Sequence, residues 1–123
     1  MPRNYANMME ELLFERLRNI LLARGIFWQE KKMMGGVTFM VDEKMCFGTF
    51  KRGLLCRVDP GERDLLLDMD GVAIMRQGGR EMKGYIHVQP ESYEVDEELE
   101  FWVNKCLEFN PKAKSSRKKR KKS

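Results

Sequence analysis

Histidine and cysteine, on which most metal sites and many nucleophilic enzymes depend, are scarce in this sequence. His87 is the only histidine, and it has no cysteine or second histidine at ligand spacing. The three cysteines, Cys46, Cys56 and Cys106, are an odd number and include no C-x-x-C pair. This count and spacing disfavour a disulfide framework and a zinc site. We expect three reduced thiols, buried or half-buried, and therefore a cytoplasmic protein.

Recognisable catalytic and membrane-inserting patterns are also absent. The sequence contains no H-E-x-x-H, G-x-x-x-x-G-K-[ST] or G-x-G-x-x-G motif. No apolar run approaches the ~20 residues of a membrane span, and the N-terminus lacks a charged-then-apolar secretory pattern. We therefore predict a non-enzymatic protein with no catalytic residue, metal, cofactor or membrane span. The less favoured alternatives are a general base at His87 and an acid–base pair among the carboxylates of residues 94–100.

Basic residues are concentrated at the C-terminal end of the chain. The net charge is +4, yet residues 112–123 hold eight basic residues and no acidic one, and the rest holds 15 basic and 19 acidic residues, a net charge of −4. These last residues have almost no apolar side chain to bury, so we expect a folded domain over 1–109 and a disordered tail over 110–123. Weak, non-specific nucleic-acid attachment is the favoured role of the tail; solubilisation and a membrane-surface or localisation role are alternatives. Its basic residues are Lys112, Lys114, Arg117, Lys118, Lys119, Arg120, Lys121 and Lys122.

Helical periodicity occurs in three places. An apolar stripe predicts a first helix over residues 8–24, after a loose segment 1–6, with a capping-box-like spacing from Asn7 to Glu10. A short helix follows Asp59, which we expect to cap it, with Pro60 at the first helical position and an end near residue 68. The third helix is capped by Asp96 and ends near residue 109, before a proline. Its core stripe is Leu99, Trp102, Val103, Cys106 and Leu107; that of the first helix is Met9, Leu13, Leu17, Ile20 and Leu21, widened by Leu12.

Six segments have strand character: part of 26–34, then 37–41, 44–49, 54–58, 73–76 and 84–89. The Asp42-Glu43 pair between the second and third is a turn, although Glu43 is a poor occupant of the two-residue type I′ turn and favours a longer or different loop. The order α-β-β-β-β-α-β-β-α predicts an α+β domain. Its antiparallel sheet has five to six strands, with helices packed on one face.

Lysines beside glycine pairs suggest a binding surface. Glycine turns leave backbone amides free to bind anions, so a partner-binding or anion-binding patch is one interpretation. Lysines that solvate a sheet edge and discourage edge pairing are the favoured alternative. Met33-Met34 beside Gly35-Gly36 is the most interesting pair for an adaptable partner surface. The patch comprises Lys31, Lys32, Met33, Gly35, Gly36, Lys83 and Gly84.

Several short motifs occur together in this chain: K-K-M at 31–33, G-G-V-T-F-M-V at 35–41, K-M-C at 44–46, M-K-G-Y at 82–85 and W-V at 102–103. In this order and spacing they resemble the N-terminal domain of the TfoX/Sxy competence-regulator family of bacteria, over about residues 12–109. Asp42-Glu43 replaces the usual Asn-Gly, and Glu81 replaces a proline. We expect this chain to lack the small helical second domain of full-length regulators.

The resemblance implies an α+β fold like that of secretion chaperones and no known enzyme chemistry. It also implies a protein partner, in the transcription machinery or an activator at promoters. We therefore expect a protein-interaction module with a weakly nucleic-acid-binding tail. An accessory nucleic-acid binder acting mainly through the tail and an uncharacterised enzyme are alternatives, and the oligomeric state is left open.

Overall fold

The computed structural model describes residues 3–33 and 35–114, and for residues 3–7 the backbone only. The described chain follows the predicted order α-β-β-β-β-α-β-β-α, with two short 3₁₀ segments, η1 (Pro90–Ser92) and η2 (Asn110–Lys112). The helices are α1 (Arg3–Ala23), α2 (Arg63–Leu67) and α3 (Asp96–Phe109). The strands are β1 (Gln29–Met33), β2 (Gly36–Val41), β3 (Lys44–Phe50), β4 (Gly53–Arg57), β5 (Val72–Gln77) and β6 (Arg80–Val88).

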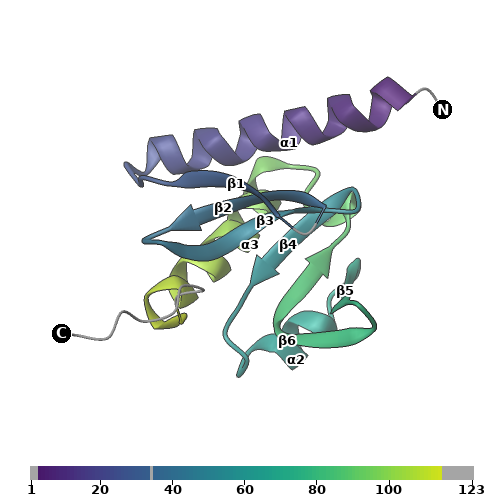
Figure 1. Cartoon of the computed structure of the whole chain (residues 1–123), viewed down its shortest axis with the longest axis vertical. Helices are drawn as coiled ribbons and strands as arrows, with labels where there is room; N and C mark the ends of the chain where they lie inside the picture. Colours follow the sequence, from purple (N-terminus) through teal and green to yellow (C-terminus); the bar gives the residue numbers. More distant parts are fainter. Residues whose placement is uncertain (1–2, 34, 115–123) are drawn as a thin grey trace.

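All six strands form one antiparallel sheet in the order β1-β2-β3-β4-β6-β5. The first four strands follow one another as a meander, whereas β6 comes back to pair with β4 and leaves β5 at the edge. In Figure 1, α1 runs along one end of the molecule, and α2 lies with the β5–β6 hairpin at the other. The predicted α+β class, antiparallel sheet and helical cover are confirmed.

Side chains alternate between the two faces of the strands, so the sheet has two apolar surfaces. On β4, Leu54 and Cys56 belong to the main core with residues of all three helices, whereas Leu55 between them belongs to a second cluster. The second cluster is formed by strand residues alone, chiefly Met40, Met45 and Met75. The β2–β3 and β5–β6 ladders each contain a register shift, the kind of irregularity that a β-bulge introduces and that bends a strand.

The apolar stripe of α3 is confirmed, and that of α1 is confirmed in part. Leu13, Leu17 and Leu21 are buried against the sheet together with Phe14, which the stripe had missed. Met9 and Leu12, both predicted to face the core, are exposed. They lie on the side of α1 that faces a groove, so no sheet residue covers them.

Several local predictions about helix starts and turns are wrong. Helix α1 begins at Arg3, so residues 3–6 are helical and Asn7 is inside the helix. Asp59 accepts a hydrogen bond from the Gly61 amide (2.9 Å) in a turn that precedes α2, and Glu62 occupies the N-cap without a side-chain bond. The N-cap of α3 is Val95, so Asp96 is the first helical residue.

The Asp42-Glu43 turn is also tighter than expected. It has two residues, because Val41 pairs with Lys44, and both centres hold positive φ, 53° and 62°. Pairing between the strands therefore holds the turn in a conformation that Glu43 alone disfavours.

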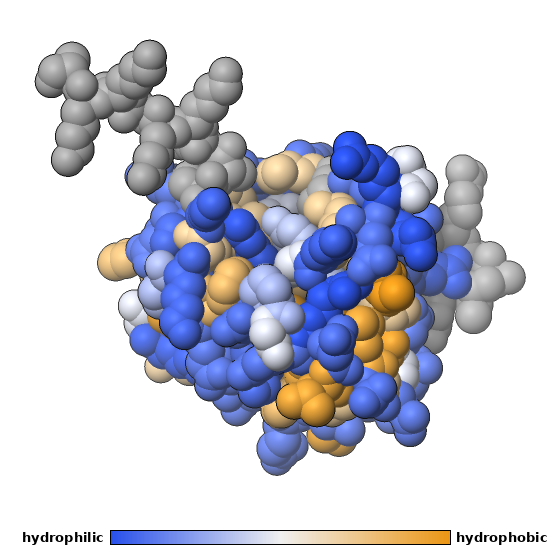
Figure 2. Space-filling model, turned by 90° about the horizontal axis from the view of Figure 1, so that it is seen from below, coloured by the Kyte–Doolittle hydropathy of each residue, from blue (hydrophilic) through white to orange (hydrophobic). Residues whose placement is uncertain are grey.

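The end of the molecule opposite α1 has an apolar surface of its own. Leu65 and Met69, in and after α2, and Ile74 on β5 are exposed. Figure 2, which views the molecule from this end, shows hydrophobic side chains gathered among charged ones. No helix of the described residues is long and apolar enough to cross a membrane.

Candidate functional site

A groove of about 630 Å³ lies beside the N-terminal half of α1. Its walls come from three separate parts of the chain: residues 9–16 of α1, the β3–β4 turn and residues 90–94 before α3. Met9, Leu12 and Leu13 form one wall, and Pro90 and Tyr93 form the other. A concave, mainly apolar surface of this volume with a few charged groups is typical of a binding site.

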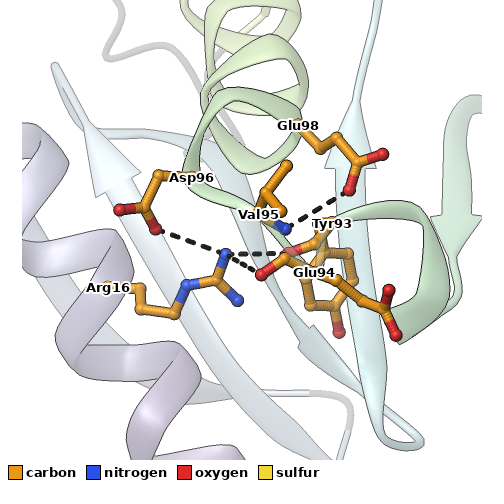
Figure 3. Close-up of polar contacts among 6 residues, drawn as sticks. All are labelled: Arg16, Tyr93, Glu94, Val95, Asp96 and Glu98. Atoms are coloured by element: carbon orange, nitrogen blue, oxygen red, sulfur yellow. Dashed lines mark hydrogen bonds and ion pairs between the residues drawn. The ribbon is translucent and has the colours of Figure 1, made fainter.

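Arg16 fixes the two walls relative to each other (Figure 3). Its Nη2 donates to the backbone carbonyl oxygens of Tyr93 (2.8 Å) and Glu94 (3.2 Å) and lies 3.5 Å from Oδ1 of Asp96. The loop is held from the core as well, because Nε1 of Trp102 donates to the carbonyl of Ser92 (3.0 Å). The Arg16 bonds join segments almost eighty residues apart, so they hold the helix wall of the groove against its loop wall.

The loop wall continues into a stabilised helix start. Glu98 accepts a hydrogen bond from the Val95 amide (3.3 Å). This is one of the two bonds of a capping box; the other needs a polar side chain at the N-cap, which Val95 lacks. Tyr93 is almost fully buried, and this burial raises the pKa of its phenol to about 12.

The rim of the groove carries the β3–β4 turn. Phe50 pairs with Gly53, so Lys51 and Arg52 are the two turn residues, with φ of 45° and 65°. Positive φ costs about 1 kcal/mol for a residue other than glycine, and the pairing of β3 with β4 imposes it here, as the pairing of β2 with β3 does at Asp42-Glu43. Within the described residues, the Arg52 guanidinium has no hydrogen bond and no ion pair.

His87 lies beneath this turn and supports it. Its Nε2 donates to the carbonyl oxygen of Phe50 (2.6 Å), and Gln89 Nε2 lies 3.4 Å from Nδ1. Glycine is required at position 53, because a Cβ there would lie 2.5 Å from Nε2 of the His87 ring. With both ring nitrogens in structural contacts, the geometry favours a supporting role for His87 over acid–base chemistry.

The three cysteines are free and buried in the core. Burial raises the pKa of the Cys46 and Cys106 thiols well above the ordinary value. A thiol with a raised pKa is a poor nucleophile and a poor metal ligand at neutral pH. Among the described residues, no cluster of three histidine, cysteine, aspartate or glutamate side chains could hold a metal ion.

The predicted lysine and glycine patch is divided between two places in the sheet. Lys31, Lys32 and Met33 are on the edge strand β1, whereas Lys83 and Gly84 are on β6. Three strands separate β1 from β6, which corresponds to about 19 Å at the usual spacing. The structure therefore does not bring the seven residues together.

Four residues of the patch, Lys32, Met33, Gly35 and Gly36, border a shallow hollow of about 410 Å³, which Glu10 also lines. Gly36 is required for packing, since a Cβ there would lie 1.8 Å from the carbonyl oxygen of Thr49. Gly35 holds a φ of 78° in open space. Met34 lies outside the described residues.

The first residues assigned to the tail are packed against the domain. Ala113 is buried, Lys44 Nζ donates to the Asn110 carbonyl (3.1 Å), and Arg57 Nη2 donates to the Lys114 carbonyl (2.9 Å). Lys112 and Lys114 are exposed beside these contacts. The other six basic residues, Arg117 to Lys122, lie outside the described residues.

Sequence reasoning did not find the groove. Its signals were present but ambiguous: Met9 belonged to the predicted stripe of α1 and Leu12 widened it, yet both are exposed, and two cations occupy a tight turn. The role of Arg16 had no signal, because its partners are backbone carbonyls far along the chain.

Comparison with known proteins gives one match. The family model described as the TfoX N-terminal domain matches residues 21–110. No curated protein matches the chain, and no solved structure matches it. The match begins near the end of α1, so it includes the turn and loop walls of the groove but not Met9, Leu12 or Arg16.

Proposed function

The chain belongs to the TfoX N-terminal domain family, and we propose that it is a non-enzymatic protein-interaction module of these competence-related regulators. The observation that carries the proposal is the groove: two exposed apolar side chains of α1 face a wall that Arg16 holds in place. A preformed apolar surface with a few charges at its rim suits docking of a protein, because little conformational entropy is lost on binding.

The alternative of an enzyme has less support. Nε2 of His87, the only histidine, donates to the carbonyl oxygen of Phe50 beside the β3–β4 turn, and its Nδ1 lies 3.4 Å from Nε2 of Gln89. The thiols are buried, and burial raises the pKa of Cys46 and Cys106, which disfavours a thiolate nucleophile. The secretion-chaperone likeness, the cytoplasmic location and the transcription-related partner remain parts of the proposal.

Affinity purification of the tagged full chain, with and without nuclease, tests this function. We expect a transcription-related protein to be retained by the wild type and by Leu22→Arg, and to be lost with Leu12→Arg. Leu22 is a matched control because it is exposed on the same helix but does not line the groove. Retention of no such protein, or equal retention by both variants, would contradict docking through the groove.

The charge distribution supports a second role, in which the basic tail attaches the domain weakly and non-specifically to nucleic acid. The tail suits this role because the rest of the chain has a net charge of −4. Truncation after Lys114 is the cleanest test, because it removes six basic residues and preserves the packed segment that ends with Ala113 and Lys114.

Binding of labelled DNA or RNA at several salt concentrations gives the readout. The full chain should bind with a log–log salt slope no steeper than about −5 from those six charges, and the truncated chain should lose nearly all binding. Unchanged binding after truncation would contradict a role for the tail.

A further inference from the structure

We propose that the edge strand β5 pairs with β5 of a second copy of this chain, antiparallel and about a two-fold axis at Ile74, so that two six-stranded sheets join into one. Figure 1 shows β5 near α2, at the end of the molecule opposite α1. The interface is separate from the groove, so it goes beyond the proposed function and leaves the groove free for a partner.

The outer edge of β5 presents backbone groups that pair with nothing in the described chain. The Gln89 amide donates to the Gly71 carbonyl (2.8 Å), so it is the odd-numbered residues here whose backbone groups face β6. Because these groups alternate along an antiparallel strand, the N–H and C=O of Ile74 and Arg76 point away from the sheet. The Val72 carbonyl also points outward, whereas its amide is already bonded in the turn before the strand.

The two edge strands of the sheet differ in their protection against pairing. The sequence of β1 is Q-E-K-K-M, with three charged residues in five, and a two-fold pair about its centre would set Lys31 opposite Lys31 of the other copy. Charged edges of this kind are a usual defence against edge-to-edge association. The sequence of β5 is V-A-I-M-R-Q, and its one charged residue is Arg76. The β5 edge therefore lacks this defence and is open to another strand.

An apolar side chain lies at the centre of the β5 edge. Ile74 is 41% exposed and pairs with Ile86 of the main core, so it lies on the face of the sheet that the helices cover. Two antiparallel copies of one strand are related by an axis perpendicular to the sheet, so both Ile74 side chains and both α2 helices lie on the same face of the joined sheet. Leu65 and Met69, exposed in and after α2, extend the apolar surface at this end of the molecule (Figure 2).

The register centred on Ile74 also matches opposite charges. It places Val72 opposite Arg76 of the other copy, so that the Arg76 amide can donate to the Val72 carbonyl. Asp70, two residues before Val72, then lies beside that arginine, within reach of a long side chain at the usual diagonal spacing of about 7–8 Å. Both side chains are exposed, and neither has a hydrogen bond or ion pair among the described residues. The symmetry repeats this pair on the other side of the axis.

Sedimentation equilibrium of the full chain, over about 1 to 100 µM, tests the dimer. We expect the mass to rise with concentration from 14.5 kDa towards twice that value. Ile74→Arg sets two cations against each other at the axis and should weaken association about tenfold or more. Leu22→Arg is the matched control, because Leu22 is 65% exposed on α1 at the opposite end, and it should leave association unchanged. Thermal unfolding followed by circular dichroism checks that each variant is folded.

Proline at position 74 tests the backbone pairing itself. The Ile74 amide bonds to nothing within the described chain, and proline is tolerated on an edge strand where the N–H faces solvent, so Ile74→Pro should leave the monomer folded. The change removes the hydrogen bond that each copy donates at the axis, so association should again fall about tenfold or more. A folded Ile74→Pro variant that associates as strongly as the wild type would refute strand pairing.

A charge swap tests the register. Asp70→Arg and Arg76→Asp should each weaken the dimer, and the two changes together should restore it. A monomer at every concentration, equal effects of Ile74→Arg and Leu22→Arg, or no recovery in the combined variant would overturn the inference.

The variants also separate this inference from the proposed function. Leu12→Arg should abolish docking in the groove and leave the dimer intact, whereas Ile74→Arg should do the reverse. A monomeric chain that loses a co-purifying protein through Leu12→Arg would refute the dimer and support docking in the groove. A dimer that depends on Ile74 but retains no regulatory protein would support the inference and contradict the regulatory role.

Discussion

Alanine substitutions at three glycines, Gly36, Gly35 and Gly84, test the register of the sheet at the family motif. The three positions differ in one respect each. Gly36 has another strand in contact, Gly35 has positive φ in open space, and Gly84 has neither. A role in binding and a role in packing therefore predict different results for the same change.

Gly36→Ala should be severely destabilising. The new Cβ would lie 1.8 Å from the carbonyl oxygen of Thr49 and 2.8 Å from its carbon, and backbone atoms cannot rotate away as a side chain can. Relief requires β2 to move away from β3 by more than 1 Å, which would break the bond from the Val37 amide to Thr49 Oγ1 (3.1 Å). We expect a loss of about 4 kcal/mol or more, a large part of a total stability of about 5–15 kcal/mol.

The other two substitutions show how much stability an alanine costs or adds where no backbone clash occurs. Gly35→Ala should cost about 1 kcal/mol, because the only penalty is positive φ for a residue with a Cβ. Gly84→Ala, within β6 and with no atom within 4 Å of the new Cβ, should stabilise the protein by about 0.5 kcal/mol, since glycine weakens a strand interior.

Urea unfolding followed by tryptophan fluorescence measures these differences, because Trp102 is 1% exposed and Trp28 is half-buried in the native protein. A lower midpoint with an unchanged slope on urea concentration would identify a loss of stability without a change in compactness. If Gly36→Ala cost no more than Gly35→Ala, the described approach of Gly36 to Thr49 would be wrong.

Three further outcomes follow from buried and paired groups. A thiol reagent should modify none of the three cysteines in the native protein and all three after unfolding. The reason is that all three are buried, and burial raises the pKa of Cys46 and Cys106. Rapid labelling of the native protein would contradict the burial of these thiols in the core. Glu30→Gln should lower the free energy of unfolding at neutral pH by at most about 1 kcal/mol, because the carboxylate accepts two 2.8 Å bonds from Arg18. The Arg18 bond lowers the Glu30 pKa below its usual 4.5, so this stability is present above that pH and is lost as the pH falls through the lower, folded value; acid titrations of both proteins should converge. Burial raises the pKa of Tyr93 from 10 to about 12, so its contribution to the free energy of unfolding is complete below pH 10 and is lost as the pH rises through 12. A near-ultraviolet absorbance titration should show one tyrosine that ionises later than the others. Ionisation of Tyr93 near pH 10 would contradict its burial.

The element order was predictable because each pattern is local. The stripe from Leu99 to Cys106 identifies a helix without reference to any other part of the chain, and the structure confirms it. The run of β-branched and large apolar residues at 37–41 identifies a strand in the same way. Helix caps were less predictable: α2 begins after Glu62, which makes no side-chain cap bond, and the N-cap of α3 is the apolar Val95, so neither start follows the usual polar-cap preference.

Turn conformation depended on both local and distant contacts. Asp42-Glu43 and Lys51-Arg52 both hold positive φ although neither pair contains glycine or asparagine. Their own preferences oppose this conformation, and the ladders of β2–β3 and β3–β4 impose it. A prediction from the turn residues alone therefore underestimates how tightly the strands are joined.

By itself, the sequence determined the α+β class, the strands and the apolar faces, because hydrophobic periodicity is a property of neighbouring residues. Only the tertiary structure decided which surfaces exist. The return of β6 to pair with β4 separates Lys83 from Lys31, and one guanidinium, on Arg16, joins α1 to carbonyls nearly eighty residues away and closes the groove wall. Backbone carbonyls are the same in every residue, so no local pattern distinguishes the two that Arg16 binds until the fold has brought them together.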